Sequence, residues 1–470
     1  MARNDIESAA IATGQTPDCA TPETPYVEKS SDAEFFDAVN ARLPDQGDSI
    51  QRHEFSLPPV DGGKDAWLLL AAVFAVDALV WGFPFAFGVF QNYYSSHEPF
   101  AGQPNVAVIG TSSMGVMYLA TPIIMGICRK FRRWARYTSL LGLFIMSLAL
   151  ALSSFAMTTT HLILSQGILY GLGGGIAYCP CIMYLDEWFV KKKGLAYGIM
   201  WSGTGLAGVV LPLVLESLLG ALGFRNTLRL WAGLLFVITA PLACFIKPRL
   251  PPSATSHVRP FNLWFLATPA FIVYQAANIV ESMGYFLPGI YLPTYARSAL
   301  GAASLSAATT VLLVNVASVF GCVVMGWLTD RFHVTTCILF STIGATVSVL
   351  VVWGLSSSLG LLYFFCVAYG LFAGSFTSAW PGIMRDIAQK GQSSSRHVDP
   401  TMVFGFLCAG RGVGNVVAGP ISESLIRGSP WTGETVAYGY GSGYGGLIVF
   451  TGVTALLGGV SFIWRRLGLL

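Results

Sequence analysis

Long apolar runs alternate with short polar breaks from residue 65 to near the end of the chain. Most of them are about 20 residues or longer, the length that an α-helix needs to cross the hydrocarbon core of a bilayer. We count twelve such runs and predict an all-α membrane protein with twelve transmembrane helices. The seventh run is the longest, and Pro288 and Pro293 are expected to break or kink it. The predicted spans lie near residues 65–92, 105–127, 138–158, 161–185, 194–219, 225–246, 263–296, 303–328, 335–355, 360–387, 401–427 and 441–464.

The stretch from Tyr170 to Pro212 shows the pattern most clearly. Two glycine-rich apolar runs flank the short charged segment DEWFVKKK, so the stretch predicts a helical hairpin that crosses the membrane twice. The glycine positions leave both helices without side chains at several points of their surface. Neighbouring backbones can therefore approach closely, as helix interfaces in lipid require.

The basic residues of the loops are segregated by side. Most Lys and Arg residues follow even-numbered spans, for example between Arg129 and Arg136 and between Lys191 and Lys193. By the positive-inside rule these loops are cytosolic, and an even span number then places both termini in the cytosol. We expect the plasma membrane, with a vacuolar or other internal membrane as the alternative.

Composition agrees with a membrane protein and sets the amino-terminal tail apart. The chain is 54% hydrophobic and 11% charged, with a mean hydropathy of +0.61. Residues 1–60 are instead acidic and contain scattered Pro, Ser and Thr, so we predict a disordered cytosolic tail. All cysteines except Cys19 lie in or beside apolar runs, which favours packing over disulfides or metal binding. Neither a cofactor nor a nucleic-acid partner is expected.

Four sequence patterns recur in the same order about 200 residues apart. An acid seven residues before a proline occurs at Asp77 in span 1 and again at Glu281 in span 7. Further matches join spans 2 and 8, spans 4 and 10, and spans 5 and 11. The chain therefore reads as a duplicated six-span unit with its binding site between the halves. The predicted parts are 61–247 for the first bundle, 248–262 for a cytosolic linker and 263–470 for the second bundle.

Several of these segments resemble the signatures of the monocarboxylate transporter family, and the sequence pattern of the remaining spans is similar to that of its fungal members. The resemblance covers about residues 60–466 and implies the major facilitator fold and, often, proton-coupled movement of small organic acids. It rests on Asp61-Gly62-Gly63 with Trp67, on Glu187-Trp-Phe-Val-Lys-Lys-Lys-Gly-Leu-Ala-Tyr-Gly-Ile through Gly203-Thr-Gly205, on Gly223-Phe-Arg225, on Gly284-Tyr-Phe-Leu-Pro288 and on Gly419-Pro420.

The departures from that family concern substrate-binding positions. Animal monocarboxylate carriers place a lysine where this chain has Phe85, and an acid and an arginine where it has Asn315 and Val319. Lactate and pyruvate are therefore not inferred as substrates. Aromatic residues such as Trp81 and Tyr285 instead predict a cavity for a larger acid.

Three ionisable residues stand deep inside predicted spans: Asp77, Glu281 and Arg411. A charge at the bilayer centre costs about 2.5–3.5 kcal/mol on insertion scales, so such residues are expected to be used. One hypothesis is that Arg411 binds an anionic or polar substrate group while Asp77 or Glu281 takes the coupled proton. The alternative is that Arg411 pairs with a carboxylate as a structural tie between helices.

Other candidates follow from their position in the spans. Polar and aromatic residues that face the same cavity are expected to bind the substrate, and charged residues at cytosolic helix ends are expected to latch the two halves together. The substrate set is Arg411, Asn278, Asn315, Trp81, Phe85, Tyr285, Trp201, Trp380 and Asn415. The latch set is Asp330, Arg331, Asp186, Glu187 and Lys191.

Taken together, the sequence predicts a secondary active transporter that moves a small organic acid by alternating access with proton coupling. Two alternatives stay open: a non-transporting nutrient sensor on the same fold, and a facilitative uniporter or effluxer of a larger secondary metabolite. The chain lacks the Ser/His, paired Asp or His-rich constellations that an intramembrane enzyme needs, so we expect no enzyme. We expect a monomer whose partners are its substrate, protons and the lipid bilayer.

Overall fold

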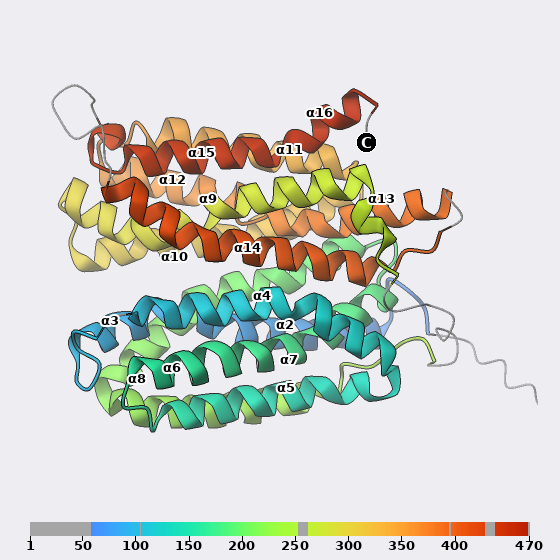
Figure 1. The fold of residues 1–470 in the computed structure, drawn as a ribbon, viewed down its shortest axis with the longest axis horizontal. Helices are drawn as coiled ribbons and strands as arrows, with labels where there is room; N and C mark the ends of the chain where they lie inside the picture. The colour runs from blue at the N-terminus through green and yellow to red at the C-terminus, as the bar shows by residue number, and fades with distance from the viewer. Residues whose placement is uncertain (1–57, 104, 252–261, 394–395, 428–437, 469–470) are drawn as a thin grey trace, which may run out of the picture. The chain divides into compact units, whose positions relative to one another are not determined.

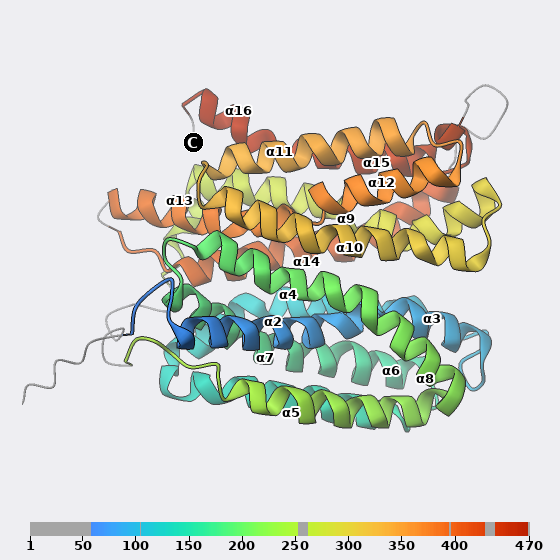
Figure 2. The same ribbon diagram turned by 180° about the vertical axis from the view of Figure 1, so that it is seen from behind.

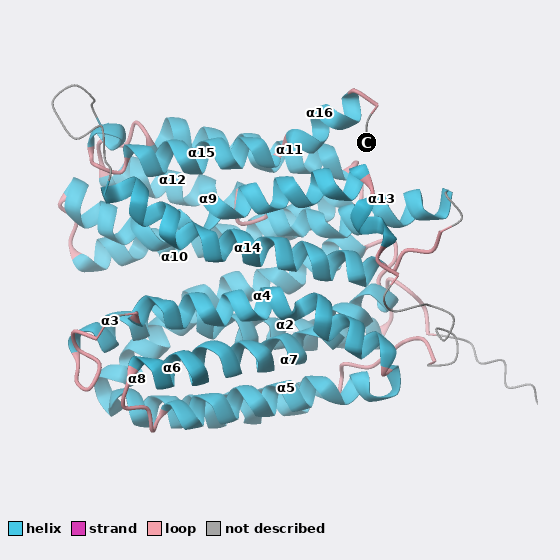
Figure 3. Ribbon diagram, viewed as in Figure 1, coloured by secondary structure: helices cyan, strands magenta, loops and turns pink. Residues whose placement is uncertain are grey.

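A computed structural model describes residues 58–103, 105–251, 262–393, 396–427 and 438–468. Most of the predicted tail 1–60 and of the predicted linker 248–262 lies outside these residues. Every regular element in the described part of the chain is helical (Figure 3). The helices form two groups, one from α2 to α8 and one from α9 to α16 (Figure 1).

The first group contains six crossings. Its elements are α2 (Lys64–Phe85), α3 (Phe87–Ser96), α4 (Val106–Lys130), α5 (Arg132–Ser153), α6 (Thr159–Leu162), η1 (Ile163–Leu169), α7 (Tyr170–Trp188) and α8 (Lys193–Ala243). The label α8 covers two crossings, because Gly223 has a φ of 69° and interrupts the helix there. Glycine tolerates that left-handed conformation without a steric penalty.

The second group repeats this plan. Its elements are η3 (Trp264–Ala267), α9 (Pro269–Leu300), α10 (Ser304–Thr329), α11 (Val334–Val347), η4 (Ser348–Trp353), α12 (Leu359–Phe372), η5 (Phe376–Ala379), α13 (Trp380–Ser393), α14 (Pro400–Arg427), η6 (Tyr438–Gly441), α15 (Gly445–Gly458) and α16 (Val460–Arg466).

The predicted number of crossings is confirmed. Ten helical segments of the described residues are long and apolar enough to span a bilayer. The second crossing within α8 and the 32-residue helix α9 complete the twelve. Of the break or kink expected in the seventh span, the break is absent, since α9 runs without interruption through Pro288 and Pro293. Neighbouring helices can satisfy the backbone groups that a proline frees, so membrane helices tolerate proline.

The two groups meet along two seams, α8 against α10 and α4 against α14 (Figures 1 and 2). Glycines permit these close approaches. A side chain on Gly326 would collide with the backbone carbonyl of Gly194, and one on Gly198 would collide with that of Cys322. In the second seam, the face of Gly412 lies against Tyr118. The glycine-rich pattern of the sequence thus marks the contact between the halves.

Candidate functional site

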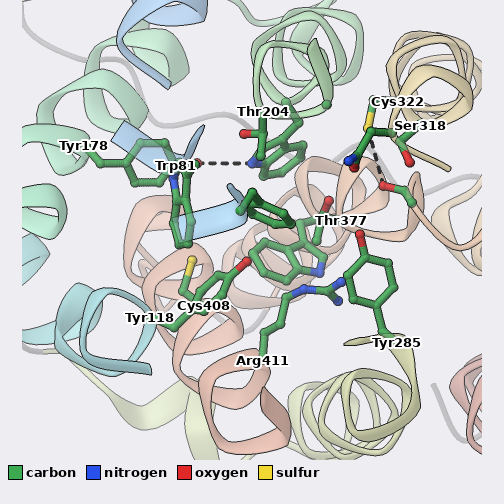
Figure 4. Close-up of a pocket in the computed structure, with 16 residues that line it drawn as sticks. Trp81, Tyr118, Tyr178, Thr204, Tyr285, Ser318, Cys322, Thr377, Cys408 and Arg411 are labelled. Atoms are coloured by element: carbon green, nitrogen blue, oxygen red, sulfur yellow. Dashed lines mark hydrogen bonds between the residues drawn. The ribbon is translucent and has the colours of Figure 1, made fainter. Parts of the chain in front are cut away.

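A cavity lies between the two seams, with about 640 Å³ of space that protein atoms leave empty, part of it open to solvent (Figure 4). Both helix groups contribute to its wall. The lining residues are Trp81, Phe85, Tyr118, Tyr178, Trp201, Thr204, Gly205, Tyr285, Asn315, Ser318, Cys322, Gly374, Thr377, Trp380, Cys408 and Arg411.

Aromatic rings make up much of this wall. Trp81 of α2 lies 4.6 Å from Tyr118 of α4, measured between ring centroids. Trp201 of α8 meets Trp380 of α13 edge to face at 5.7 Å, so these two rings join the helix groups. The indole N–H of Trp201 donates to the hydroxyl of Tyr178 at 3.1 Å. Such rings offer large, flat apolar surfaces to a ligand.

Arg411 is the charged member among the described residues that line the cavity. Its side chain is buried, and Nη1 donates to Oε2 of Glu281 at 2.9 Å. The guanidinium carbon also lies 4.1 Å from the ring centroid of Tyr285, a cation–π distance. Glu281 therefore neutralises Arg411 from behind, while Arg411 itself reaches the cavity wall.

Asp77 occupies a different environment on α2. Its side chain is fully buried, and Oδ2 accepts a hydrogen bond from the hydroxyl of Thr204 at 2.6 Å. Oδ1 has no hydrogen-bond partner, and Asp77 makes no ion pair with any described residue. Thr204 lines the cavity, so one hydroxyl group separates Asp77 from it.

Seven of the predicted substrate-binding residues line this cavity: Arg411, Asn315, Trp81, Phe85, Tyr285, Trp201 and Trp380. Asn278 and Asn415 do not, although both share helix faces with residues that belong to the site. Asn278 is buried within its own half, where Nδ2 donates to the carbonyl of Leu407 at 2.8 Å. Asn315 makes a contact that the sequence does not suggest, since its Nδ2 donates across the halves to the carbonyl of Gly208 at 3.1 Å.

The sequence pattern misses several members of the wall, among them Tyr118, Tyr178, Thr204 and Thr377. Hydroxyl-bearing residues are common in apolar spans, so none of these stands out in a single sequence. Cys408 is partly foreseeable, because it precedes Arg411 by three residues on the same helix face.

At the end of the bundle where the basic loops lie, polar contacts join the two halves. Arg129 of α4 pairs with Asp399, Nη2 to Oδ1 at 2.8 Å. Asp330, which follows α10, accepts hydrogen bonds from the backbone N–H groups of Gly194 at 2.7 Å and Leu195 at 2.8 Å. Burial raises the pKa of Asp330 above its ordinary value, and these two N–H donors offset part of that rise. The structure is therefore closed at this end.

The other residues predicted to latch the halves have different partners. Asp186 pairs with Lys193 at 2.5 Å, and Glu187 pairs with Arg132, both within the first half. The backbone N–H of Lys191 donates to Asp61 at 3.0 Å. The guanidinium of Arg331 lies over the ring of Trp327 at 4.0 Å. Within the described residues, cross-half contacts thus belong to Asp330 and to the unforeseen pair of Arg129 and Asp399.

Comparison with known proteins gives a consistent result. Residues 69–395 match the family model of the Major Facilitator Superfamily. The MFS transporter asaE of Aspergillus flavus is 26% identical over 412 residues, which cover 86% of this chain and 87% of that protein. The Agnestins efflux protein AgnL12 of Paecilomyces divaricatus is 28% identical over 414 residues, covering 87% of this chain and 89% of that protein.

Proposed function

Because the family model matches more than half of its length, the chain belongs to the major facilitator superfamily and is a membrane transporter rather than an enzyme. We propose that its cargo is an organic acid with an aromatic or similarly flat apolar skeleton. The observation that carries this proposal is the position of Arg411. It brings a guanidinium to the wall of an aromatic cavity between the two halves.

The acid group of the cargo would bind Arg411. A guanidinium holds a carboxylate through paired N–H donors, and such charge-assisted hydrogen bonds are strong away from bulk water. Glu281 occupies Arg411 in the present conformation, so an incoming carboxylate competes with Glu281 for the same cation. The rings of Trp81, Tyr118 and Trp201 would then stack on the skeleton of the cargo.

Proton coupling would involve Asp77 or Glu281. A carboxylate deep in a membrane protein needs a cation or a proton, since burial of an unpaired charge is costly. Glu281 loses its cation when a substrate takes Arg411, which favours proton binding there. Asp77 pairs with no cation among the described residues and would carry its proton with Thr204 as its contact to the cavity. Both groups therefore link charge movement to substrate binding.

Two features bear on direction and orientation. One relative is named an efflux protein, which supports export of a secondary metabolite as a second candidate for this chain. The resemblance to monocarboxylate porters supports an acid as the cargo in either direction. We further propose that the protein lies in the plasma membrane with its basic, closed end on the cytosolic side, so that the cavity in this conformation communicates with the outside of the cell.

Transport by purified protein in proteoliposomes tests the proposal. Labelled lactate, benzoate, 2-naphthoate and anthracene-2-carboxylate would be offered with and without a pH gradient. We expect the ring-bearing acids to be carried in preference to lactate, transport to respond to the gradient, and Arg411→Ala to abolish it. Arg466→Ala at the exposed carboxy-terminal helix is the control and should transport normally.

Full activity of Arg411→Ala, or equal transport of lactate and 2-naphthoate, would overturn the proposal. Deletion of residues 1–56 addresses the sensor alternative, since unchanged flux without that segment argues for a carrier.

A further inference from the structure

The junction of α4 and α5, hereafter the turn, carries five basic residues within eight positions. Arg129 and Lys130 end α4, and Arg132, Arg133 and Arg136 lie in the first turns of α5. Two of them point into the protein and have acidic partners. Arg129 is 12% exposed and pairs with Asp399, while Arg132 is 8% exposed and pairs with Glu187. These two residues tie the turn to both halves of the molecule.

The other three bases, Lys130, Arg133 and Arg136, are exposed and take part in no ion pair with the described residues. The ammonium of Lys130 lies 5.6 Å from the ring centroid of Phe131. The guanidinium carbon of Arg136 lies 4.8 Å from the ring centroid of Tyr137. These three exposed bases thus have no carboxylate partner within the part of the chain that the structure describes.

Aromatic residues alternate with these bases and are equally exposed. Phe131 is 52% exposed, Trp134 is 68% exposed and Tyr137 is 53% exposed. Trp134 and Tyr137 lie 6.3 Å apart, so their rings form one platform. Amphipathic rings of Trp and Tyr collect at the level of the lipid headgroups, where one edge is wet and the other apolar.

An apolar strip continues from this platform along α5. Leu141, Phe144 and Leu148 are all exposed and recur at helical spacing on one face. Figures 1 and 2 both place α5 at the outer edge of the first helix group. Phe144 touches Phe236 of α8 at 6.3 Å between ring centroids, yet 53% of its side chain remains exposed. The interleaved bases and rings therefore come first along the chain and the apolar strip of α5 follows them, as the acyl chain of a phospholipid follows its headgroup.

We propose that the basic-aromatic turn, residues 130–137, is a binding site for an anionic phospholipid. Lys130, Arg133 and Arg136 hold the headgroup phosphate, Trp134 and Tyr137 lie beside the glycerol region, and an acyl chain covers the strip on α5. A soluble anion would use the bases but leave the rings and the strip exposed. This site is independent of the cargo cavity and of the function proposed above.

The site adjoins the contact that closes the basic end. Arg129 and Lys130 are consecutive, one facing Asp399 and the other facing the headgroup. A lipid that gathers the three outward bases keeps the turn in the orientation in which Arg129 reaches Asp399. Anionic lipid therefore favours the closed arrangement of this end.

The experiment measures lipid binding by the purified full chain in phosphatidylcholine nanodiscs that contain increasing phosphatidylserine, with bound lipid counted by native mass spectrometry. Wild type is expected to retain phosphatidylserine over phosphatidylcholine. The variant K130Q/R133Q/R136Q is expected to lose that preference, by about fivefold for each base removed. Trp134→Ala should weaken retention of both lipids.

The matched control is K192Q/R465Q/R466Q, which removes three exposed bases from the same end but not from the turn. It should retain phosphatidylserine as wild type does. Equal loss in the control would show a diffuse electrostatic effect and overturn the site, as would unchanged retention in the turn variant. Water-soluble glycerophosphoserine should fail to compete; competition at lipid-like concentrations would identify a soluble anion as the ligand instead.

Discussion

Arg411 and Glu281 stand 130 positions apart in the chain, yet they form a buried ion pair of 2.9 Å inside the second helix group. Both side chains are nearly inaccessible, with 3% and 5% of their surface exposed. A buried pair of this kind depends on both partners, because each ion is costly to bury without the other.

The first prediction separates the structural role of this pair from its role in transport. Arg411→Leu and Glu281→Leu each leave one buried charge without its partner and should each destabilise the protein by about 3–5 kcal/mol. The double variant leaves no charge behind and should recover most of that stability, but it should not transport. Thermal unfolding in detergent and proteoliposome uptake measure the two quantities. A double variant that transports would remove Arg411 from the mechanism.

A second prediction concerns Asp77, whose carboxylate accepts a hydrogen bond from the hydroxyl of Thr204 at 2.6 Å. Asp77→Asn resembles the neutral acid in shape, so the variant should fold and should still exchange labelled for unlabelled cargo. It should no longer accumulate or expel cargo against a gradient when driven by pH, since the amide cannot carry the proton. Retention of pH-driven transport would exclude Asp77 as the coupling group.

The helices and their number could be predicted from the sequence because they depend on local properties. A run of about 20 apolar residues has few alternatives to a membrane helix, since unpaired backbone groups are so costly in lipid. Charged residues inside apolar runs also predict the site, because a charge in the bilayer is costly unless it is used. Arg411 and Glu281 stand out in this way, and the structure brings them together. The rings of Trp81, Trp201 and Trp380 belong to the same group of foreseeable cavity residues.

Side-chain partners at helix ends could not be predicted, because they depend on how the helices meet. Asp186, Glu187 and Arg331 lie at helix ends, as a residue that bridges the two halves would. Their charged groups nevertheless contact residues of their own half: Lys193, Arg132 and Trp327. Arg129 is one of five similar bases, and which of them faces Asp399 follows from the rotation of α4. Asn278 shares a helix face with Tyr285, which lines the cavity, yet its amide donates to the backbone of α14 instead.

A third prediction uses Asp61 and Asp330, which both accept hydrogen bonds from the backbone at or just before the start of α8. Their pKa values are shifted from the ordinary value in opposite directions. Asp61 accepts from the backbone N–H groups of residues 190–192. Partial burial acts to raise its pKa, but these donors outweigh that effect and lower it. Asp330 accepts from Gly194 and Leu195, and burial dominates there and raises its pKa.

The signs follow from proton linkage. Asp61, with a lowered pKa, stabilises the fold above the ordinary value of 3.8, and this contribution is lost as the pH falls through the lowered pKa. Asp330, with a raised pKa, contributes fully below 3.8 and loses that contribution as the pH rises through the raised value. The melting-temperature advantage of wild type over Asp61→Asn should therefore grow with pH, and its advantage over Asp330→Asn should shrink. Parallel profiles of the two variants would contradict this assignment.

The last prediction concerns the seam between α8 and α10. Gly326 faces the backbone of Gly194 so closely that a methyl group at position 326 would overlap the carbonyl of Gly194. Backbone cannot move aside as a flexible side chain would, so Gly326→Ala forces the two halves apart at the basic end. Overpacking costs about 1–3 kcal/mol, which corresponds to a shift of roughly 5- to 150-fold between the closed and open arrangements.

Gly233→Ala is the matched control, because no atom outside its own helix lies within 4 Å of the added methyl group. Cys322 provides the readout: it is buried in this conformation and lines the cavity, so opening of the basic end exposes its thiol. Modification of Cys322 by a water-soluble maleimide added at the basic end, followed by peptide mass spectrometry, should be faster in Gly326→Ala than in wild type and unchanged in Gly233→Ala. Equal rates in all three proteins would mean that the seam does not control access to the cavity, and the closing contacts would then reduce to those of Asp330 and Arg129.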